Sequence, residues 1–378
     1  NQTRFYAAFA TSLGATMGIA FAANLFTLFV FYELLTVATY PLVTHAGSDE
    51  AKRAGRVYLG ILMGTSIGFL LLAIIWTWQL TGTLHFAPGG ILGGERDTVL
   101  LGALLVLFVL GTGKAALMPF HRWLPAAMVA PTPVSALLHA VAVVKAGVFT
   151  ILKVSVYIFG LDLIRDLSAA DWLAYLAGLT ILIASFVALS RDNLKARLAY
   201  STVSQLGYIV LGALLGVTAG VVGGTMHIVM HAFGKITLFF CAGAVLVAAH
   251  KTRVSELDGL GRRMPLTMAA FLVGALSIVG LPPMGGTWSK WMLVQGTLDA
   301  QTWVLTAVLL LSSLLNLLYL VVIPIRAFFA APSGTPDGGG IREAPLPILL
   351  AIMTTAAGCI ILFLRPEPLF QLAGEILK

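Results

Sequence analysis

The feature that most constrains this chain is a series of apolar runs, each long enough to cross a lipid bilayer. A helix needs about 20 mostly apolar residues for one crossing. Charged residues make up only 10% of the 378 residues, whereas about 25% is usual in a soluble domain. The sequence therefore predicts an all-α, polytopic membrane protein of about 11 transmembrane helices. The predicted spans are 5–22, 24–43, 56–78, 98–118, 134–159, 172–189, 194–216, 219–248, 266–295, 302–329 and 346–364.

Basic residues are distributed unevenly between the two sets of loops that these spans create. One side of the membrane would hold 14 lysines and arginines and the other side 5, with 4 more lysines inside the spans. The positive-inside rule makes the richer side cytoplasmic, and we expect the bacterial cytoplasmic (inner) membrane. That side comprises the N-terminal end and the loops 44–55, 119–133, 190–193, 249–265 and 330–345. The net charge of +7 then reflects topology and requires no nucleic acid as partner.

Ionisable side chains inside the spans indicate what such a chain does. The segment GGTMHIVMHAFGKITLFF at 223–240 carries His227, His231 and Lys235 at steps of four residues, which keeps them on nearly one helix face. A charge at the bilayer centre costs about 2.5–3.5 kcal/mol or more. We interpret these groups as a proton relay, because buried lysines and histidines can exchange protons near neutral pH. The other members of the predicted relay are Glu33, Lys114, His139, Lys145 and Lys290.

Other interpretations of these residues are weaker. A single buried Glu–Lys pair can be purely structural. His227 and His231 have the spacing of two metal ligands, but no carboxylate or cysteine in the same run completes a site. The GTGK at 111–114 lacks the first glycine and the final Ser or Thr of a phosphate-binding loop. We therefore expect no metal and no bound cofactor. In a remaining alternative the chain is a scaffold for partner subunits, and changes along the relay would be silent.

Two spans are interrupted by helix-breaking residues beside a lysine. Pro119 follows Lys114, and the PPMGG cluster at 282–286 precedes Lys290. Broken helices beside ionisable residues are typical of transporter sites. The breaks fall five spans apart, and a repeat with an odd number of spans must be inverted in the membrane. We predict inverted repeats at 5–159 and 172–329, followed by a C-terminal span at 346–364. The matched lysines would be Lys114 with Lys290, and Lys145 with Lys235.

Five sequence blocks, spread over nearly the whole chain, resemble one family. They are FYELLTVATYPLV (31–43), FHRWLPAAMVAPTPVSALLHAVAVVKAGVF (120–149), LKARLAYSTVSQLGYIVLG (194–212), MHIVMHAFGKITLFFCAGAV (226–245) and GLPPMGGTWSKW (280–291). These blocks resemble the antiporter-like subunits of complex I and of Mrp-type cation/proton antiporters. The loop THAGSDEAKRAGRVYLG is most similar to the D-type subunits of Mrp antiporters. The resemblance implies two inverted five-helix repeats, and it implies that three N-terminal helices of the family are missing from this chain.

The resemblance also implies a function and a role for each relay residue. Glu33 would be the carboxylate paired with Lys114, and Lys290 would be the exit lysine. The intermediate carriers would be His139, Lys145, His227, His231 and Lys235. The chain would be a proton-translocating subunit of a multi-subunit complex, with other membrane subunits as partners and Na⁺ or K⁺ exchanged for protons.

An alternative within the same family is a proton-pumping subunit of a complex I-like oxidoreductase, hydrogenase or inorganic-carbon uptake complex. The chain contains no cysteine cluster, dinucleotide fingerprint or haem motif. We therefore expect any redox chemistry, such as that of an NADH-quinone oxidoreductase, to reside in partner subunits.

Overall fold

The chain folds into a bundle of helices, and the prediction of an all-α protein is confirmed. The computed structural model describes residues 2–94, 97–331 and 340–377, and no β-strand occurs among them. Short 3₁₀ or π turns are labelled η. The first part of the bundle contains α1 (Gln2–Ala20), α2 (Leu25–Val43), α3 (Asp49–Thr65), η1 (Ser66–Leu70), α4 (Leu71–Thr81), α5 (Thr98–Gly111), η2 (Gly113–Ala115), α6 (Trp123–Ala126), η3 (Ala127–Val129), α7 (Thr132–Ala136), η4 (Leu137–Val141), α8 (Val143–Val154) and η5 (Ser155–Phe159). The second part contains α9 (Leu161–Asp166), α10 (Ser168–Ser190), α11 (Leu194–Leu214), α12 (Thr218–Ala249), η6 (Val254–Glu256), η7 (Leu260–Arg262), α13 (Pro265–Val279), α14 (Gly286–Asp299), α15 (Trp303–Asn316), η8 (Leu317–Val321), α16 (Val322–Phe329), α17 (Leu346–Leu364) and α18 (Glu367–Glu375).

Each predicted span coincides with helical structure, although the ends differ by several residues. Some helices start at polar N-caps: the side chain of Asn24 accepts from the Thr27 amide, and that of Asn193 accepts from the Ala196 amide. Among the described residues, 7 helical segments are long and apolar enough to cross a membrane, and α5 and α13 are shorter apolar helices. The total of 11 crossings stays a prediction. Residues 332–339 of the predicted loop 330–345 lie outside the described residues.

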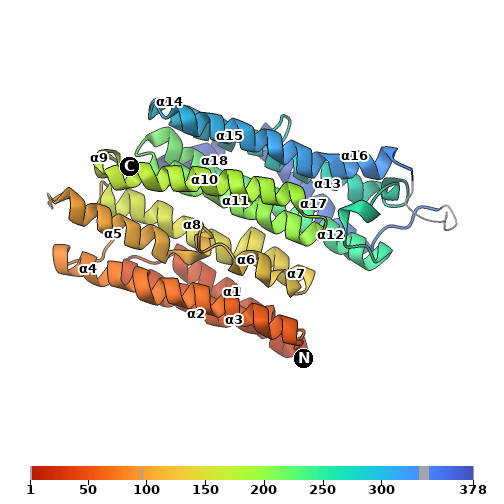
Figure 1. Cartoon of the computed structure of the whole chain (residues 1–378), viewed down its shortest axis with the longest axis horizontal. Helices are drawn as coiled ribbons and strands as arrows, with labels where there is room; N and C mark the ends of the chain where they lie inside the picture. The colour runs from red at the N-terminus through yellow and green to blue at the C-terminus, as the bar shows by residue number, and fades with distance from the viewer. Residues whose placement is uncertain (1, 95–96, 332–339, 378) are drawn as a thin grey trace.

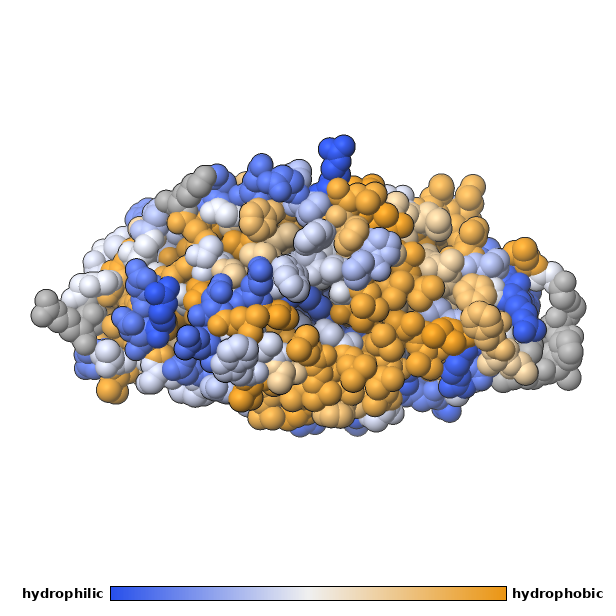
Figure 2. Space-filling model, turned by 90° about the horizontal axis from the view of Figure 1, so that it is seen from above, coloured by the Kyte–Doolittle hydropathy of each residue, from blue (hydrophilic) through white to orange (hydrophobic). Residues whose placement is uncertain are grey.

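The helices run roughly along the long axis of the molecule (Figure 1). The N-terminus lies at the end of the bundle where α7, α12 and α16 are labelled, and the C-terminus lies near α9 at the opposite end. Large apolar side chains such as Phe21, Trp78 and Leu310 are exposed on the outside. Figure 2 shows broad hydrophobic areas on one face, with hydrophilic clusters toward the two ends of the long axis. Such a surface fits a bilayer as its solvent.

Two helices are broken in the middle of the bundle, with Lys114 inside the first break and Lys290 just after the second. The helix α5 ends at Gly111, and the chain turns through η2 to Ala116, which has a left-handed φ of 54°. The helix α13 ends at Val279, and Gly280 continues with a φ of 86° before α14 begins at Gly286.

The proposed inverted repeat pairs the first five spans with the next five. Under this pairing α5 corresponds to the broken helix α13–α14, so Lys114 and Lys290 occupy equivalent segments. Lys145 lies on the fifth span and Lys235 on the eighth. These two lysines are therefore not equivalent under the pairing, and the repeat itself stays a prediction.

Candidate functional site

The seven basic residues of the predicted relay all lie inside the bundle, away from the apolar outer surface. Each is at most 7% exposed. They are Lys114, His139, Lys145, His227, His231, Lys235 and Lys290. In the described part of the chain, no carboxylate lies within 4.0 Å of any of the four lysines. Their polar partners are instead backbone carbonyls, hydroxyls and a histidine, which can hold an ammonium without fixing its charge permanently.

A direct hydrogen bond joins the first and second halves of the chain at the centre of the bundle. Lys145 on α8 donates from Nζ to Nδ1 of His231 on α12 over 2.7 Å. The lysine lies just after the π turn η4, a local irregularity that is frequent at functional sites. The rings of His231 and His227 follow one another along α12, with centroids 5.7 Å apart.

His227 is held on both ring nitrogens. Its Nε2 lies 3.2 Å from Oε1 of Gln205, to which it donates, and its Nδ1 lies 2.9 Å from the Ser289 hydroxyl. The same hydroxyl lies 3.1 Å from the carbonyl of Gly286, to which it can donate. Ser289 can therefore donate to Nδ1 of a neutral imidazole, or accept from a protonated one while donating to Gly286. The site accommodates both charge states of His227.

Tyr208 connects His227 with the lysine of the second broken helix. Its ring stacks on that of His227 at a centroid distance of 5.7 Å. The ammonium of Lys290 lies 4.6 Å from the centroid of the same ring, where the negative face of the ring attracts it. We call Lys145, His231, His227, Tyr208 and Lys290 the central chain.

Lys290 takes its remaining contacts from the helix break and from α15. Its Nζ donates to the carbonyl of Val279 over 3.2 Å and to the hydroxyl of Ser313 over 3.0 Å. The carbonyl is available because α13 ends there and leaves its last acceptors unpaired. Lys290 also lines a cavity of about 380 Å³, together with exposed side chains such as Trp291 and Leu310. The ammonium is thus buried but lies close to an opening in the bundle.

Lys114 lies apart from the central chain, against α2. Its Nζ donates to the carbonyl of Tyr32 over 2.9 Å and to the hydroxyl of Thr36 over 2.6 Å, and it lies 3.2 Å from the centroid of the Tyr32 ring. The backbone of this broken segment packs tightly on α8, where a Cβ on Gly147 would overlap the amide nitrogen of Ala115. The structure shows no hydrogen bond between Lys114 and Lys145 among the described contacts.

The predicted ion pair between Glu33 and Lys114 is not formed. Both carboxylate oxygens of Glu33 are buried and have no hydrogen-bond partner among the described residues. The carboxylate is still near enough to interact electrostatically with Lys114. The lysine instead satisfies its donors with Tyr32 and Thr36, which lie on the same helix as Glu33.

Two further predicted carriers are buried but are not linked to the central chain by hydrogen bonds. Lys235 donates to the carbonyl of Leu198 on α11 over 3.2 Å. His139 packs its ring against Phe239 and interacts with the backbone of Leu124, and neither of its ring nitrogens bonds to a residue of the central chain. The stripe at 227–235 is therefore split, because steps of four residues overshoot the helical turn by about 40° each. Lys235 is turned toward α11 and away from the line of the two histidines.

Sequence reasoning did not find the partners that complete the central chain. These are Tyr208, Gln205 and Ser289. Tyr208 and Gln205 lie in the block LKARLAYSTVSQLGYIVLG, where polar residues recur inside an otherwise apolar span. Ser289 directly precedes Lys290. The recurrence of polar residues was the available signal, but it does not say which side chain faces a histidine.

Comparison with known proteins places this geometry in a family context. The family described as "NADH:quinone oxidoreductase/Mrp antiporter, TM" matches residues 22–316. The N subunit of the NADH-quinone oxidoreductase of Desulforudis audaxviator is 36% identical over 352 residues, which cover 92% of this chain and 68% of the relative. The D subunit of the Na⁺/H⁺ antiporter of Alkalihalophilus pseudofirmus is 29% identical, and the match covers 98% of this chain and 75% of the relative.

Solved structures show the same fold. A chain of the Mrp complex from Dietzia sp. DQ12-45-1b superposes with a TM-score of 0.86 at 24% identity, covering 97% of this chain and 76% of that one. A chain of the membrane-bound sulfane sulfur reductase, an archaeal respiratory membrane complex, gives a TM-score of 0.84 at 27% identity, covering 98% of this chain and 75% of that one. The family match over residues 22–316 and the relative at 36% identity show that this multi-pass membrane protein belongs to the NADH:quinone oxidoreductase/Mrp antiporter transmembrane family.

Proposed function

We propose that the chain is a proton-translocating, antiporter-like subunit of a multi-subunit membrane complex, in which protons are exchanged for Na⁺ or K⁺. The observation that carries the proposal is the central chain, which begins with the 2.7 Å hydrogen bond from Lys145 to His231. Side chains that can take up and release protons follow one another from there to Lys290 inside a bundle whose outer surface is apolar. Intramembrane ionisable groups of this kind commonly mark ion pathways.

A proton can move along the central chain in short steps. Lys145 passes a proton from Nζ to Nδ1 of His231, which leaves a neutral amine and an imidazolium. The next acceptor is the ring of His227. Because the two ring centroids are 5.7 Å apart, the proton crosses this gap through a water molecule or by rotation of a ring. Ser289 then reorients its hydroxyl as His227 becomes protonated. The proton passes from His227 through water, beside the ring of Tyr208, to the neutral amine of Lys290, and His227 returns to the neutral imidazole.

The other predicted carriers act at the margins of this chain. Lys114 and Glu33 would exchange protons with Lys145 through water, since no side chain bridges them. Lys235 and His139 would tune the same region by electrostatic repulsion, because both carry basic groups into the interior. The end of the bundle that holds the N-terminal end and the loops 44–55, 119–133, 190–193 and 249–265 would face the cytoplasm of a bacterial cell, and so would the predicted loop 330–345.

The experiment is the substitution His227→Phe in the complex assembled in native membranes. The phenyl ring keeps the shape and the stacking on Tyr208, but it cannot carry a proton. We expect proton exchange in inverted vesicles, driven by an imposed Na⁺ or K⁺ gradient, to fall by about 100-fold or more. The matched control is His45→Phe, the same change at an exposed histidine next to Phe5. Normal exchange in His227→Phe, with normal assembly, would favour a scaffold and reject the proposal.

A second candidate is the proton-pumping membrane subunit of a complex I-like respiratory complex. The relative named as the N subunit of an NADH-quinone oxidoreductase, at 36% identity, favours it. In that case proton movement in the same vesicles requires an electron donor and is independent of Na⁺ and K⁺. Under either candidate His227→Phe abolishes proton movement, and the driving force tells the two apart.

A further inference from the structure

A cavity of about 410 Å³ lies between the ends of several helices, and none of the residues that line it belongs to the central chain. Residues of α9, α10, α11 and the connection between α14 and α15 form its wall. Figure 1 places α9 and α14 at the end of the bundle opposite the N-terminus. Part of the wall is apolar and buried, as at Ile164 and Leu215. Three charged side chains also line the cavity, and they are Arg165, Asp171 and Asp299.

Arg165 is held on one side and leaves donors free on the other. Its Nε and Nη2 donate to the carbonyl of Gly216 over 3.3 and 3.0 Å. Gly216 has a left-handed φ of 63°, and a Cβ there would lie 2.8 Å from the backbone nitrogen of Arg165, so the two segments approach closely. The remaining contact, from Nη1 to the exposed Asp162, is 3.8 Å long, which is too long for a hydrogen bond. Since a guanidinium has five N–H donors, Arg165 can still bind an anion.

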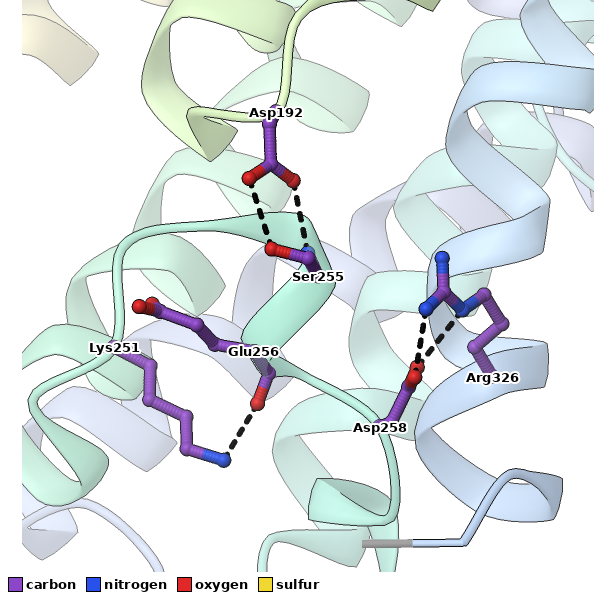
Figure 3. Close-up of polar contacts among 6 residues, drawn as sticks. All are labelled: Asp192, Lys251, Ser255, Glu256, Asp258 and Arg326. Atoms are coloured by element: carbon purple, nitrogen blue, oxygen red, sulfur yellow. Dashed lines mark hydrogen bonds and ion pairs between the residues drawn. The ribbon is translucent and has the colours of Figure 1, made fainter. Parts of the chain in front are cut away.

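The carboxylates at the other end of the bundle show how exposed acidic side chains are satisfied elsewhere in this chain. There Asp192 accepts from the backbone amide and the hydroxyl of Ser255 (Figure 3). Asp258 accepts from Nε and Nη2 of Arg326 over 2.8 and 2.6 Å, as the same figure shows. Both carboxylates therefore have partners within the chain.

Asp171 and Asp299 in the cavity have no such partners. In the part of the chain that the structure describes, neither carboxylate forms an ion pair within 4.0 Å or a side-chain hydrogen bond. Asp171 lies in the first turn of α10, where the helix dipole favours a negative charge. Asp299 is the last residue of α14, where the dipole disfavours one. A carboxylate at this unfavourable position indicates a cationic partner that the described residues do not supply.

The opposite charges of the cavity are kept apart from one another. Arg165 lines the same cavity as Asp171 and Asp299, yet it forms no ion pair with either of them among the described contacts. The carbonyl of Gly216 holds the guanidinium on its own side. A simple anion in the cavity would meet two carboxylates, and a simple cation would meet the guanidinium. The arrangement is complementary to a ligand that carries both charges.

Aromatic side chains indicate that the cavity lies at the membrane surface. Tyr175 lines the cavity, Trp303 begins α15 beside it, and both are exposed. Tryptophan and tyrosine gather where lipid headgroups meet the hydrocarbon core. From Tyr175 an exposed apolar face continues along α10 through Leu179, Ile183 and Phe186, because steps of four, four and three residues stay on one side of a helix. A ligand seated in the cavity could extend apolar chains along this face.

We propose that the cavity binds the headgroup of a phospholipid that carries a primary ammonium, of the phosphatidylethanolamine class. The lipid phosphate accepts from the free donors of Arg165. The ammonium has three N–H donors, so it can bond to both Asp171 and Asp299. The inference goes beyond the proposed function and does not depend on it. It requires only that this end of the bundle meets the bilayer surface.

The chemistry of the cavity also distinguishes among phospholipids. A choline headgroup has no N–H donor for the two carboxylates, and a glycerol headgroup has no positive charge for them. Soluble glycerophosphoethanolamine presents the same charges as the lipid, but it has no acyl chains to cover the apolar face of α10. The lipid therefore satisfies both features of the surface. Because it would join α9, α10 and α14 in the folded state only, it should stabilise the protein.

The test measures lipid binding to the detergent-purified complex by native mass spectrometry, with the subunit released from the complex as the readout. Phosphatidylethanolamine, phosphatidylcholine and phosphatidylglycerol are added at equal concentrations. We expect the wild type to prefer phosphatidylethanolamine by about tenfold. The double variant Asp171→Asn/Asp299→Asn keeps the shape of both side chains and should lose this preference. Arg165→Gln removes the phosphate partner and should weaken all three lipids by about tenfold.

The matched control is Asp162→Asn, which removes an exposed carboxylate from α9 outside the lining of the cavity. It should keep the wild-type preference. Equal binding of the three lipids by the wild type would overturn the proposal. So would a preference that survives in the double variant or disappears in Asp162→Asn. Displacement of the lipid by an equal concentration of glycerophosphoethanolamine would identify a soluble ligand and overturn the lipid assignment.

A second measurement needs no variant. Added phosphatidylethanolamine should raise the melting temperature of the wild-type complex more than phosphatidylcholine does. This difference should vanish in the double variant, whose melting temperature without added lipid should match that of the wild type because both aspartates are exposed. Equal shifts by the two lipids in the wild type would count against the proposal. Proton exchange plays no part in either readout, so failure of the proposed function leaves this test intact.

Discussion

Replacing Lys145 with methionine separates the contribution of this residue to stability from its contribution to transport. Lys145 is 6% exposed. Its ammonium has one polar partner, Nδ1 of His231, and no carboxylate within 4.0 Å among the described residues. Methionine follows the aliphatic stem of lysine closely, so Lys145→Met leaves little cavity.

Two opposing terms decide the stability of Lys145→Met. Loss of a hydrogen bond that involves a charged group costs about 1.5–3 kcal/mol. Removal of a buried, unpaired ammonium gains several kcal/mol, since the desolvation of each ion costs that much after relaxation. The second term is at least as large as the first. We therefore expect Lys145→Met to be as stable as the wild type or more stable, while proton exchange falls by about 100-fold or more.

The assay combines thermal unfolding of the purified complex with proton exchange in inverted vesicles. The matched control is Lys153→Met on the same helix, where the half-buried Lys153 donates to the carbonyl of Ala22 over 2.7 Å, outside the central chain. We expect this control to keep wild-type exchange. A variant Lys145→Met that melts well below the wild type but still exchanges protons would refute the reasoning, because the lysine would then be a structural residue.

Two smaller predictions concern packing and pH. In Gly286→Ala the new Cβ would overlap the carbonyl oxygen of Ser277, far inside van der Waals contact, so we expect the free energy of unfolding to fall by about 3 kcal/mol or more. In Gly14→Ala the new Cβ meets no atom within 4 Å, so this variant should be neutral or more stable by roughly 0.5–1 kcal/mol. Thermal unfolding of both variants checks this prediction. Hydrogen bonds from the amide and the hydroxyl of Ser255 hold the pKa of Asp192 below its usual range, so this contact stabilises the folded loop above the pKa of an unfolded aspartate and is lost as pH falls through the lowered value. The protection factor of the Ser255 amide, which corrects its exchange rate for the intrinsic pH dependence of amide exchange, should therefore fall in acid, and an unchanged protection factor would contradict the assignment.

The sequence was sufficient to predict the helices and the burial of the basic residues of the predicted relay. A long apolar run in a membrane has to form a helix, and the few charged side chains within such runs have to face the interior of the protein. It was not sufficient for the partner of each charge. Glu33 and Lys114 are complementary in charge, but the turn after Gly111 directs the ammonium to Tyr32 and Thr36 instead. The partner of an inward-facing lysine depends on the backbone geometry at the helix break, and the sequence pattern does not reveal that geometry.

The buried hydroxyls of Ser185, Ser204 and Ser312, which contact one another, show a second limit of the sequence. Serine and threonine are common in membrane helices, where most bond to the carbonyl four residues earlier. Thr202 does this on α11, whereas Ser204 two residues later reaches serines on two other helices. Both are 0% exposed, so composition and burial do not distinguish them. Only the relative rotation of three helices does.

Lys290 is the residue at which these observations meet. Its ammonium contacts the ring of Tyr208, which belongs to the central chain, and donates to the hydroxyl of Ser313 on α15. An ammonium has three donors and a flexible stem, so it can exchange these partners by rotation alone. Under the proposed function, a proton that reaches Lys290 from His227 would leave through the cavity of about 380 Å³ that Lys290 lines. Because the helix break leaves the carbonyl of Val279 as a resting partner for the ammonium, the proposed function lets Lys290 hold a proton there without joining the cavity to His227. A coupled exchanger requires such a separation to avoid a leak.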